Sequence, residues 1–190
     1  MKENKSKYAI MGILSMGPMS GYDIKKTFER RLAYFWSESY GQIYPILKNL
    51  AKQRLATRSI KKQEGKPDRH IYALTDKGRK ALQEWMIQPV ERQIGRYEIL
   101  LKLFFGQQVS LADNIRQVEH FRKLQSQKLK EIKATEEVLK ADHKDNPNLT
   151  YWLMTVRCGQ YVNRAYLRWS DETLAVLKGM EQEGVIKNGN

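Results

Sequence analysis

Residues 39–79 read SYGQIYPILKNLAKQRLATRSIKKQEGKPDRHIYALTDKGR, and this stretch decides the fold of the first half of the chain. Its first third, residues 39–53, carries apolar residues at helical spacing, which predicts an amphipathic helix. The apolar stripe consists of Ile43, Ile46, Leu47 and Leu50. The remaining surface of this helix carries Tyr40, Gln42, Tyr44, Lys48 and Lys52. A polar and cationic face therefore lies opposite a face suited to a core.

Two short segments after this helix have strand character. Residues 56–62 and 69–74 are separated by Gly65 and Pro67, which mark a turn. This pattern predicts a β-hairpin with a basic tip. In the preceding helix, Pro45 removes one backbone hydrogen bond, which predicts a local kink or a late helix start.

Further helices flank this stretch on both sides. Residues 5–16 are apolar enough to form a buried helix, with a signal peptide as the alternative. Ser20 and Asp23 form a capping box that opens a second helix, and Thr75 caps a fourth helix after the hairpin. Three helices, a hairpin and a closing helix are the parts of a winged helix-turn-helix domain, which we expect over residues 1–90.

The second half, residues 91–190, has an all-helical pattern. A short apolar helix over residues 97–105 precedes a long helix over residues 110–141, and a break at residues 145–148 precedes a second long helix. These helices cannot bury their apolar faces alone, so we expect a homodimer. The predicted fold is mainly α with a small β-hairpin, in which an N-terminal winged helix-turn-helix domain (residues 1–90) is followed by a C-terminal all-helical dimerisation domain (residues 91–190).

The charge of the chain favours a polyanionic partner. The formal net charge is +13, and residues 1–90 hold 18 Lys and Arg against 8 Asp and Glu, whereas residues 91–190 hold 16 against 13. Double-stranded DNA is therefore the expected partner of the first half. A winged-helix module that binds RNA or a protein partner without operator specificity is the alternative. No apolar run has the roughly 20 residues of a membrane span, so we expect no membrane partner.

Residues that could support catalysis or metal binding are sparse. Cys158 is the only cysteine, which excludes an intrachain disulfide and fits a reducing cytoplasm. We interpret it as a small core residue, with a redox sensor as the alternative. The histidines His70, His120 and His143 lack a second ligand at a standard metal spacing. We find no phosphate-binding loop or catalytic motif, and therefore expect no cofactor, no metal and no enzymatic activity.

Four ordered motifs link this chain to a known family. They are residues 20–24 (SGYDI), 34–36 (YFW), 40–47 (YGQIYPIL) and 65–79 (GKPDRHIYALTDKGR). Together they resemble the winged helix of the PadR family of transcriptional regulators, and residues 97–106 (YEILLKLFFG) resemble the start of the family's longer helical domain. Arg54 stands where the family often has glycine, and a left-handed helix end there would cost about 1 kcal/mol.

The resemblance implies a homodimer that represses a nearby gene by occupying a roughly palindromic operator. An activator is the less favoured alternative. In some members of the family a small aromatic compound, such as a phenolic acid, releases the protein from DNA. The expected effector-binding residues are the aromatic Trp36, Tyr151, Trp152, Tyr161 and Trp169, whose alternative role is in the core or the dimer interface.

The expected DNA-binding residues fall into two groups. Gln42 and Tyr44, with Tyr40 beside them, are candidates for reading bases, because Gln can bond adenine in a bidentate manner and Tyr can offer a hydroxyl group. The alternative for Tyr44 is packing inside the domain. The candidates for sequence-independent phosphate contacts are Lys48, Lys52, Lys66 and Arg69.

Overall fold

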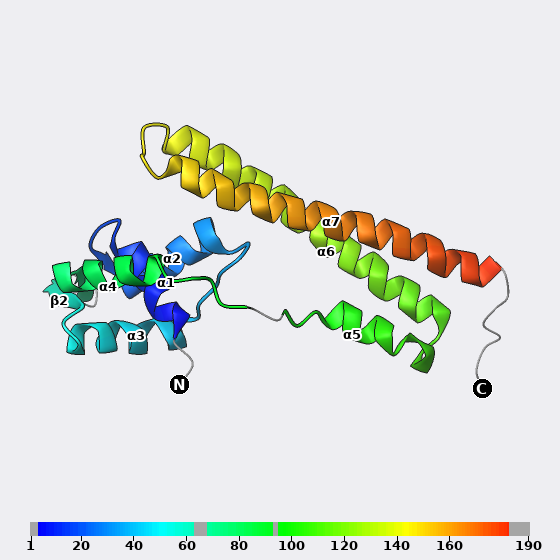
Figure 1. Ribbon diagram of the computed structural model, residues 1–190, viewed down its shortest axis with the longest axis horizontal. Helices are drawn as coiled ribbons and strands as arrows, with labels where there is room; N and C mark the ends of the chain where they lie inside the picture. The colour runs from blue at the N-terminus through cyan, green and yellow to red at the C-terminus, as the bar shows by residue number, and fades with distance from the viewer. Residues whose placement is uncertain (1–3, 63–67, 93–94, 183–190) are drawn as a thin grey trace. The chain divides into compact units, whose positions relative to one another are not determined.

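Figure 1 shows the computed structural model of the chain, which describes residues 4–62, 68–92 and 95–182. The chain forms two compact units, Met1–Arg92 and Gln93–Asn190. Helices dominate both units and the sheet is small, which confirms the predicted class of fold. Across the described residues, no helix combines the length and apolarity that crossing a bilayer requires.

Helices make up most of the first unit. They are α1 Lys5–Leu14, α2 Gly21–Thr27, α3 Tyr40–Lys52 and α4 Asp76–Met86, with the π-helical turn η1 Phe28–Leu32 continuing α2. The predicted caps are present: the side chain of Ser20 accepts from the Asp23 N–H, and that of Thr75 accepts from the Gly78 N–H. Each cap satisfies a backbone donor that the first helical turn leaves without a partner.

A three-stranded antiparallel sheet completes the first unit. Its strands are β1 Met19–Ser20, β2 Ala56–Lys61 and β3 Arg69–Leu74, in the order β1-β3-β2. The hairpin of β2 and β3 was predicted, but β1 was not. Two residues are too short to show the alternation that marks a strand. In the register of the sheet, Ser20 pairs with Ile71 and Lys61 pairs with Arg69.

The core of the first unit lies between α1, α2, α3 and the sheet. The predicted stripe of α3 points into it, and Ile43, Leu47 and Leu50 are at most 1% exposed. Burial of each such side chain stabilises the fold by roughly 1.5–3 kcal/mol. At the edge of this core the rings of Tyr8 and Trp85 stack with centroids 4.6 Å apart, so α4 is held against α1.

Pro45 lies inside α3 and does not delay the start of the helix. The helix begins at Tyr40, directly after Ser39, so the predicted late start is wrong. Pro45 removes one backbone donor, which would otherwise bond the carbonyl group of Gly41 in the same helix. The stabilised first turn and the buried stripe compensate for the loss of one bond.

Arg54 ends α3 in the left-handed conformation, with a φ of 58°. The N–H of Leu55 donates to the carbonyl oxygen of Leu50, and the N–H of Arg54 donates to that of Ala51. This pair of bonds is the Schellman motif, in which glycine usually occupies the left-handed position. The left-handed turn that glycine usually provides therefore forms here with arginine.

The second unit is a long helical hairpin with a short helix before it. Its elements are α5 Glu98–Phe104, the 3-10 turn η2 Gly106–Gln108, α6 Leu111–Asp142 and α7 Leu149–Gln182. Figure 1 shows α6 and α7 lying side by side along most of their length. Val118 of α6 and Leu174 of α7 form a small core with Ile99 of α5. The predicted pattern of one short and two long helices is confirmed.

Large apolar side chains of α5, and of Phe105 directly after it, remain on the surface of this unit. Leu101 is 62% exposed, Phe104 is 82% exposed and Phe105 is 57% exposed. Isolated apolar side chains are normal on a protein surface, but Leu101 and Phe104 lie three positions apart on one face of α5, and the ring of Phe104 contacts that of Phe105 with centroids 5.0 Å apart. Adjacent exposed apolar side chains of this kind are typical of an interaction site. The helix that begins the second unit therefore presents more apolar surface than this unit covers.

Candidate nucleic-acid interface

The outer face of α3 is exposed to solvent. Tyr40 and Tyr44 each leave 41% of their surface accessible, and their rings stack with centroids 6.2 Å apart. Lys48 and Lys52 continue the same face and are exposed. Because residues four positions apart lie above one another on a helix, a pair of phenol rings is followed by two ammonium groups along one surface.

Tyr44 is also in contact with the helix before α3. A Cβ atom added to Gly21, the first residue of α2, would lie 2.7 Å from Cε1 of Tyr44. The absence of a side chain at Gly21 thus lets the ring of Tyr44 approach the backbone of α2. Tyr44 is thus partly exposed, as its predicted role in reading bases requires, and it also packs against α2.

Gln42 takes part in the cap of α3. Its Oε1 atom accepts hydrogen bonds from the N–H of Ser39 at 3.0 Å and from the Oγ–H of Ser39 at 2.9 Å. A bidentate contact with adenine needs this same oxygen as an acceptor. The geometry therefore favours Gln42 as a residue that fixes the first turn of α3.

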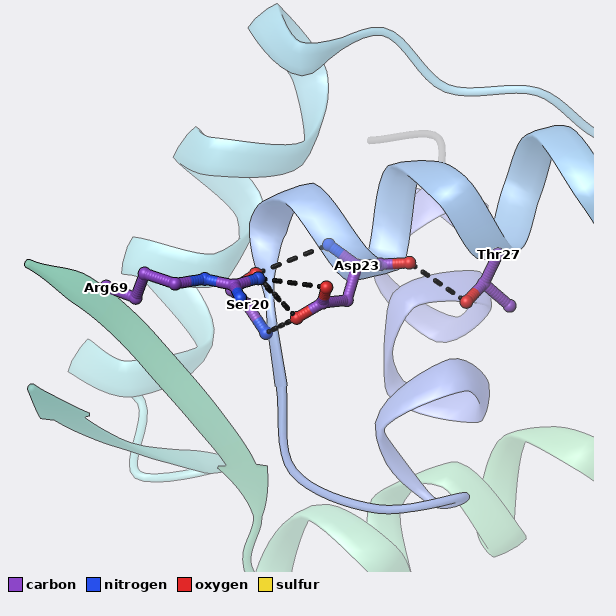
Figure 2. Close-up of polar contacts among 4 residues, drawn as sticks. All are labelled: Ser20, Asp23, Thr27 and Arg69. Atoms are coloured by element: carbon purple, nitrogen blue, oxygen red, sulfur yellow. Dashed lines mark hydrogen bonds and ion pairs between the residues drawn. The ribbon is translucent and has the colours of Figure 1, made fainter. Parts of the chain in front are cut away.

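Arg69, at the start of β3, is held by the first turn of α2. Figure 2 shows its guanidinium group reaching Asp23 and Ser20. The Nη2 atom lies 2.9 Å from each carboxylate oxygen of Asp23 and 2.7 Å from Oγ of Ser20. The ion pair is partly accessible, with 35% of the Arg69 side chain and 41% of the Asp23 side chain exposed.

The environment of Asp23 favours its charged form. Partial burial raises the pKa of Asp23, but hydrogen bonds from the side chain and backbone of Ser20 and from Arg69 outweigh it, so the pKa falls below its ordinary value of 3.8. Ser20 donates from its N–H at 3.1 Å and from its Oγ–H at 2.7 Å. A carboxylate that accepts several such bonds stays ionised and keeps its partners in place.

The hairpin contributes further cations. Lys66 lies outside the described residues. Arg58 of β2 is exposed, and its Nη2 atom lies 2.9 Å from Nε2 of His70 on β3. Arg58 was not among the expected DNA-binding residues, which in the hairpin were Lys66 and Arg69. The pairing of the two predicted strands could have pointed to Arg58, because it makes Arg58 and His70 diagonal neighbours on adjacent strands.

The expected effector-binding residues are distributed over both units. In the first unit Trp36 packs against the core and donates from Nε1 to Oε1 of Glu38 at 2.9 Å. In the second, Trp152 meets the ring of His143 and Trp169 meets that of Phe121. Trp152 and Trp169 are 17 residues apart on α7, about 26 Å along the helix. They therefore cannot line the same small pocket of one protomer.

The two remaining effector candidates lie on the surface of α7. Tyr151 is 68% exposed and Tyr161 is 69% exposed. Neither lines the cavity between α5 and α6 that is described below. Their accessibility suits an interface as well as a ligand.

An open cavity of about 770 Å³ lies between α5 and α6. Its lining combines aromatic and cationic side chains, including Arg96, Tyr97, Lys102, Arg116 and Phe121. On the side away from the cavity, the ring of Phe121 contacts the rings of Trp169 and Tyr166 edge to face. Burial, and then a hydrogen bond with Tyr97, raises the pKa of Tyr166 to about 12, so its hydroxyl group stays neutral. Trp169 was among the expected effector-binding residues, whereas Tyr97 and Phe121 were not.

A metal site was not expected. Among the residues that the structure describes, no group of three His, Cys, Asp or Glu side chains is placed to hold a metal ion. Cys158 is exposed on α7, so its interpretation as a small core residue is wrong. Its position on the helix places it away from the buried Val156 and Gln160.

Two family models match the chain, one in each unit. Residues 10–84 match the transcriptional regulator PadR-like family. Residues 95–178 match the C-terminal domain of the virulence activator alpha family. The boundary between the two matches falls where the two compact units meet in the sequence.

Individual relatives cover almost the whole chain. The negative transcriptional regulator PadR of Bacillus subtilis is 30% identical over 90% of this chain and 96% of its own length. The crystal structure of that protein with operator DNA matches with a TM-score of 0.78, covering 92% of this chain and 99% of the other. Its complex with p-coumaric acid matches with a TM-score of 0.70 at 29% identity, covering 90% and 94%.

These matches confirm the resemblance that the four sequence motifs indicate. They extend it through the second unit, where the likeness in sequence motifs ends near Gly106. Both the family and the relative are transcriptional regulators, which confirms the prediction that the chain is not an enzyme. The chain belongs to the PadR-like family of transcriptional regulators.

Proposed function

We propose that this chain binds double-stranded operator DNA as a homodimer and represses a nearby gene in the cytoplasm. The observation that carries the proposal is the exposed outer face of α3. In a helix-turn-helix domain, the second helix of the motif enters the major groove. The complex of Bacillus subtilis PadR with operator DNA, and the role of that protein as a negative regulator, support the same function here.

The side chains of α3 have separate roles in this proposal. Tyr40 and Tyr44 contact base edges or sugars through their exposed rings and hydroxyl groups. Lys48 and Lys52 contact phosphates, which strengthens binding to any sequence. We assign Gln42 to the cap of α3. Lys66 keeps its expected phosphate contact at the hairpin.

The second unit supplies the dimer contact and the effector site in this proposal. The exposed side chains of Leu101, Phe104 and Phe105 give α5 an apolar surface that a second copy of the chain would cover. A two-fold dimer presents two copies of α3, and half-sites about 34 Å apart lie on one face of DNA. The proposed operator is therefore a palindrome with that spacing.

We assign an aromatic carboxylate as the effector class. The complex of Bacillus subtilis PadR with p-coumaric acid supports this class. In the present chain, the cavity between α5 and α6 has related chemistry, since Tyr97 and Phe121 offer ring faces and Arg96 offers a cation. Lys102 and Arg116 add two further cations, which form ion pairs with Glu98 and Asp113 in this structure. A ligand there weakens DNA binding only if it prefers the protein conformation that does not fit the operator.

Footprinting of the region upstream of the chain's own gene tests DNA binding. We expect two protected half-sites, related by two-fold symmetry and about 34 Å apart. A double variant, Lys48→Ala with Lys52→Ala, should lower the log-log slope of affinity against salt by about one for each lost phosphate contact.

The matched control is Lys123→Ala with Lys130→Ala, which removes two exposed cations from α6 instead. This control should retain the wild-type footprint. Uniform protection without symmetric half-sites would contradict operator binding and favour a non-specific nucleic-acid module.

Fluorescence titration with p-coumaric acid tests the effector class. A ligand at the cavity should quench Trp169, which lies behind Phe121, and the quenching should be lost in Trp169→Phe but retained in Trp152→Phe. Linkage requires the ligand to bind less tightly when operator DNA is present. Equal affinity with and without DNA would rule out this compound as an inducer.

A further inference from the structure

The first turn of α2 contacts both parts of the first unit that face DNA in the proposed function. We call residues Ser20, Gly21 and Asp23 the α2 joint. Ser20 and Asp23 contact β3 of the hairpin, and Gly21 contacts α3. A single helical turn thus lies between the hairpin and the predicted recognition helix.

On the hairpin side, the joint holds β3 through side-chain bonds in addition to the backbone pairing of β1 with β3. The ladder between β1 and β3 ends at the pair of Ser20 with Ile71. Arg69 lies two residues further toward the hairpin tip, and its guanidinium group bonds Ser20 and both carboxylate oxygens of Asp23. Arg69 also pairs with Lys61 of β2, and this is the last pair of the β2–β3 ladder on the side of the hairpin tip. The ion pair therefore anchors the hairpin close to its tip (Figure 2).

On the α3 side, the joint works through close backbone contact. The ring of Tyr44 lies so near Gly21 that an added Cβ atom would be 2.7 Å from Cε1 and 3.0 Å from Cζ. Tyr44 is on the outer face of α3 and stacks on Tyr40. The position of α2 thus limits where the aromatic pair of α3 can lie.

We propose that the α2 joint sets the position of the hairpin relative to α3, and that Asp23 and Arg69 are positioning residues for operator recognition. This inference rests on the proposed function, because it assumes that α3 and the hairpin both contact DNA. It gives Arg69 a role that differs from the phosphate contact expected from the sequence. Its guanidinium group bonds Ser20 and Asp23 within the protein instead of a phosphate group.

The chemistry of the pair suits a positioning role. Arginine presents its donors in a rigid planar fork, so a bond to a carboxylate restricts direction as well as distance. Asp23 is itself fixed by two hydrogen bonds from Ser20. The positive and negative charges also offset each other. A free Asp23 carboxylate on a DNA-facing domain would repel phosphates.

Removal of the carboxylate distinguishes positioning from simple attraction. Asp23→Asn deletes a negative charge, so electrostatics alone would strengthen DNA binding. The joint predicts the opposite sign, a loss of operator affinity of roughly tenfold, with much less effect on random DNA. The matched control is Glu29→Gln, which removes one negative charge from η1 just after α2 and should not weaken operator binding.

A double-mutant cycle assigns the effect to the pair. Arg69→Gln should weaken operator binding about as much as Asp23→Asn, and the double variant should be no weaker than either single variant. If Arg69 acts as a phosphate ligand instead, Arg69→Gln alone would weaken binding and lower the salt slope by about one, while Asp23→Asn would bind more tightly. That result would overturn the proposal. Thermal unfolding of each variant gives the folded fraction that enters these comparisons.

A distance measurement reports the geometry without DNA. Nitroxide labels are attached at Lys48→Cys on α3 and Lys61→Cys on β2, in a Cys158→Ser background and diluted with unlabelled chain. The wild-type pair should give a narrow distance distribution, and Asp23→Asn should broaden or shift it. An unchanged distribution in a folded Asp23→Asn variant would overturn the proposal.

The two sets of results separate the joint from the proposed function. If the wild type gives no operator footprint, the proposed function fails, while the distance distributions still test the joint. If the wild type gives a footprint and Asp23→Asn binds the operator as well as Glu29→Gln does, the joint fails and operator binding stands.

Discussion

At the scale of single residues, Arg54 carries backbone strain that glycine would relieve. Its φ of 58° places its backbone in the left-handed region at the end of α3, where the Cβ atom is crowded by the following carbonyl group. Arg54→Gly should therefore raise the free energy of unfolding by about 1 kcal/mol, measured by urea denaturation. Gln53→Gly is the control. Gln53 has a φ of −80°, so glycine relieves no strain there and only increases the conformational entropy of the unfolded chain. A loss of stability in both variants would contradict the strain at Arg54.

Gly78 lies at a position where no side chain fits. A Cβ atom there would lie 2.0 Å from the backbone carbonyl oxygen of Leu55, which cannot move away as a side chain would. Gly78→Ala should lower the free energy of unfolding by about 1–3 kcal/mol through overpacking. Gly41→Ala in α3 is the control, since its Cβ atom would meet only Oγ of Ser39 at 3.7 Å. That variant should be stabilised by roughly 0.5–1 kcal/mol, and equal effects at both glycines would contradict the argument.

At the scale of secondary-structure elements, the contact between α2 and β3 should weaken in acid. Because the pKa of Asp23 is lowered by Ser20 and Arg69, the charged form stabilises the folded state. That contribution is complete above the ordinary pKa of 3.8 and is lost as the pH falls through the lower folded value. The stability advantage of the wild type over Asp23→Asn should therefore shrink below about pH 4. A difference that stays constant between pH 3 and pH 7 would show that charge is not its source.

The elements themselves were largely predictable from the sequence. The stripe of Ile43, Leu47 and Leu50 identified α3, and the caps at Ser20 and Thr75 identified the starts of α2 and α4. These signals are local, since they depend on spacing within one element. Strand β1 was missed because its pairing with β3 involves residues about fifty positions away. No local pattern reports such a pairing.

At the scale of the whole molecule, the exposed apolar surface of α5 should hold the dimer together. Phe104→Asp with Leu101→Asp should raise the dissociation constant of the dimer by roughly thirtyfold or more, as expected for central interface residues. Sedimentation equilibrium measures this change. Ile60→Asp, at an exposed apolar position of the hairpin, is the control and should remain dimeric. A wild-type chain that is monomeric at micromolar concentration would contradict the dimer itself.

The site was less predictable than the fold. Exposure of Tyr40, Tyr44, Lys48 and Lys52 agrees with the outward face expected from helical geometry. The contacts of Gln42 and Arg69 depend instead on the hydrogen-bond partners that the tertiary structure brings near them. A sequence shows that these side chains are polar, but not whether the protein itself uses their hydrogen-bonding capacity. The cavity next to Tyr97 and Phe121 was not predicted either, because it forms only where two helices pack together in the tertiary structure.

The division of α3 into an exposed and a buried face also has an evolutionary consequence. Ile43, Leu47 and Leu50 hold the helix in the core, whereas Tyr40 and Lys48 lie on the opposite, exposed side. Substitutions on the exposed side change few packing contacts, and surface changes usually alter stability by less than about 0.5 kcal/mol. Duplicated copies of such a gene can therefore diverge toward new target sequences through outer-face substitutions while the ancestral domain remains folded.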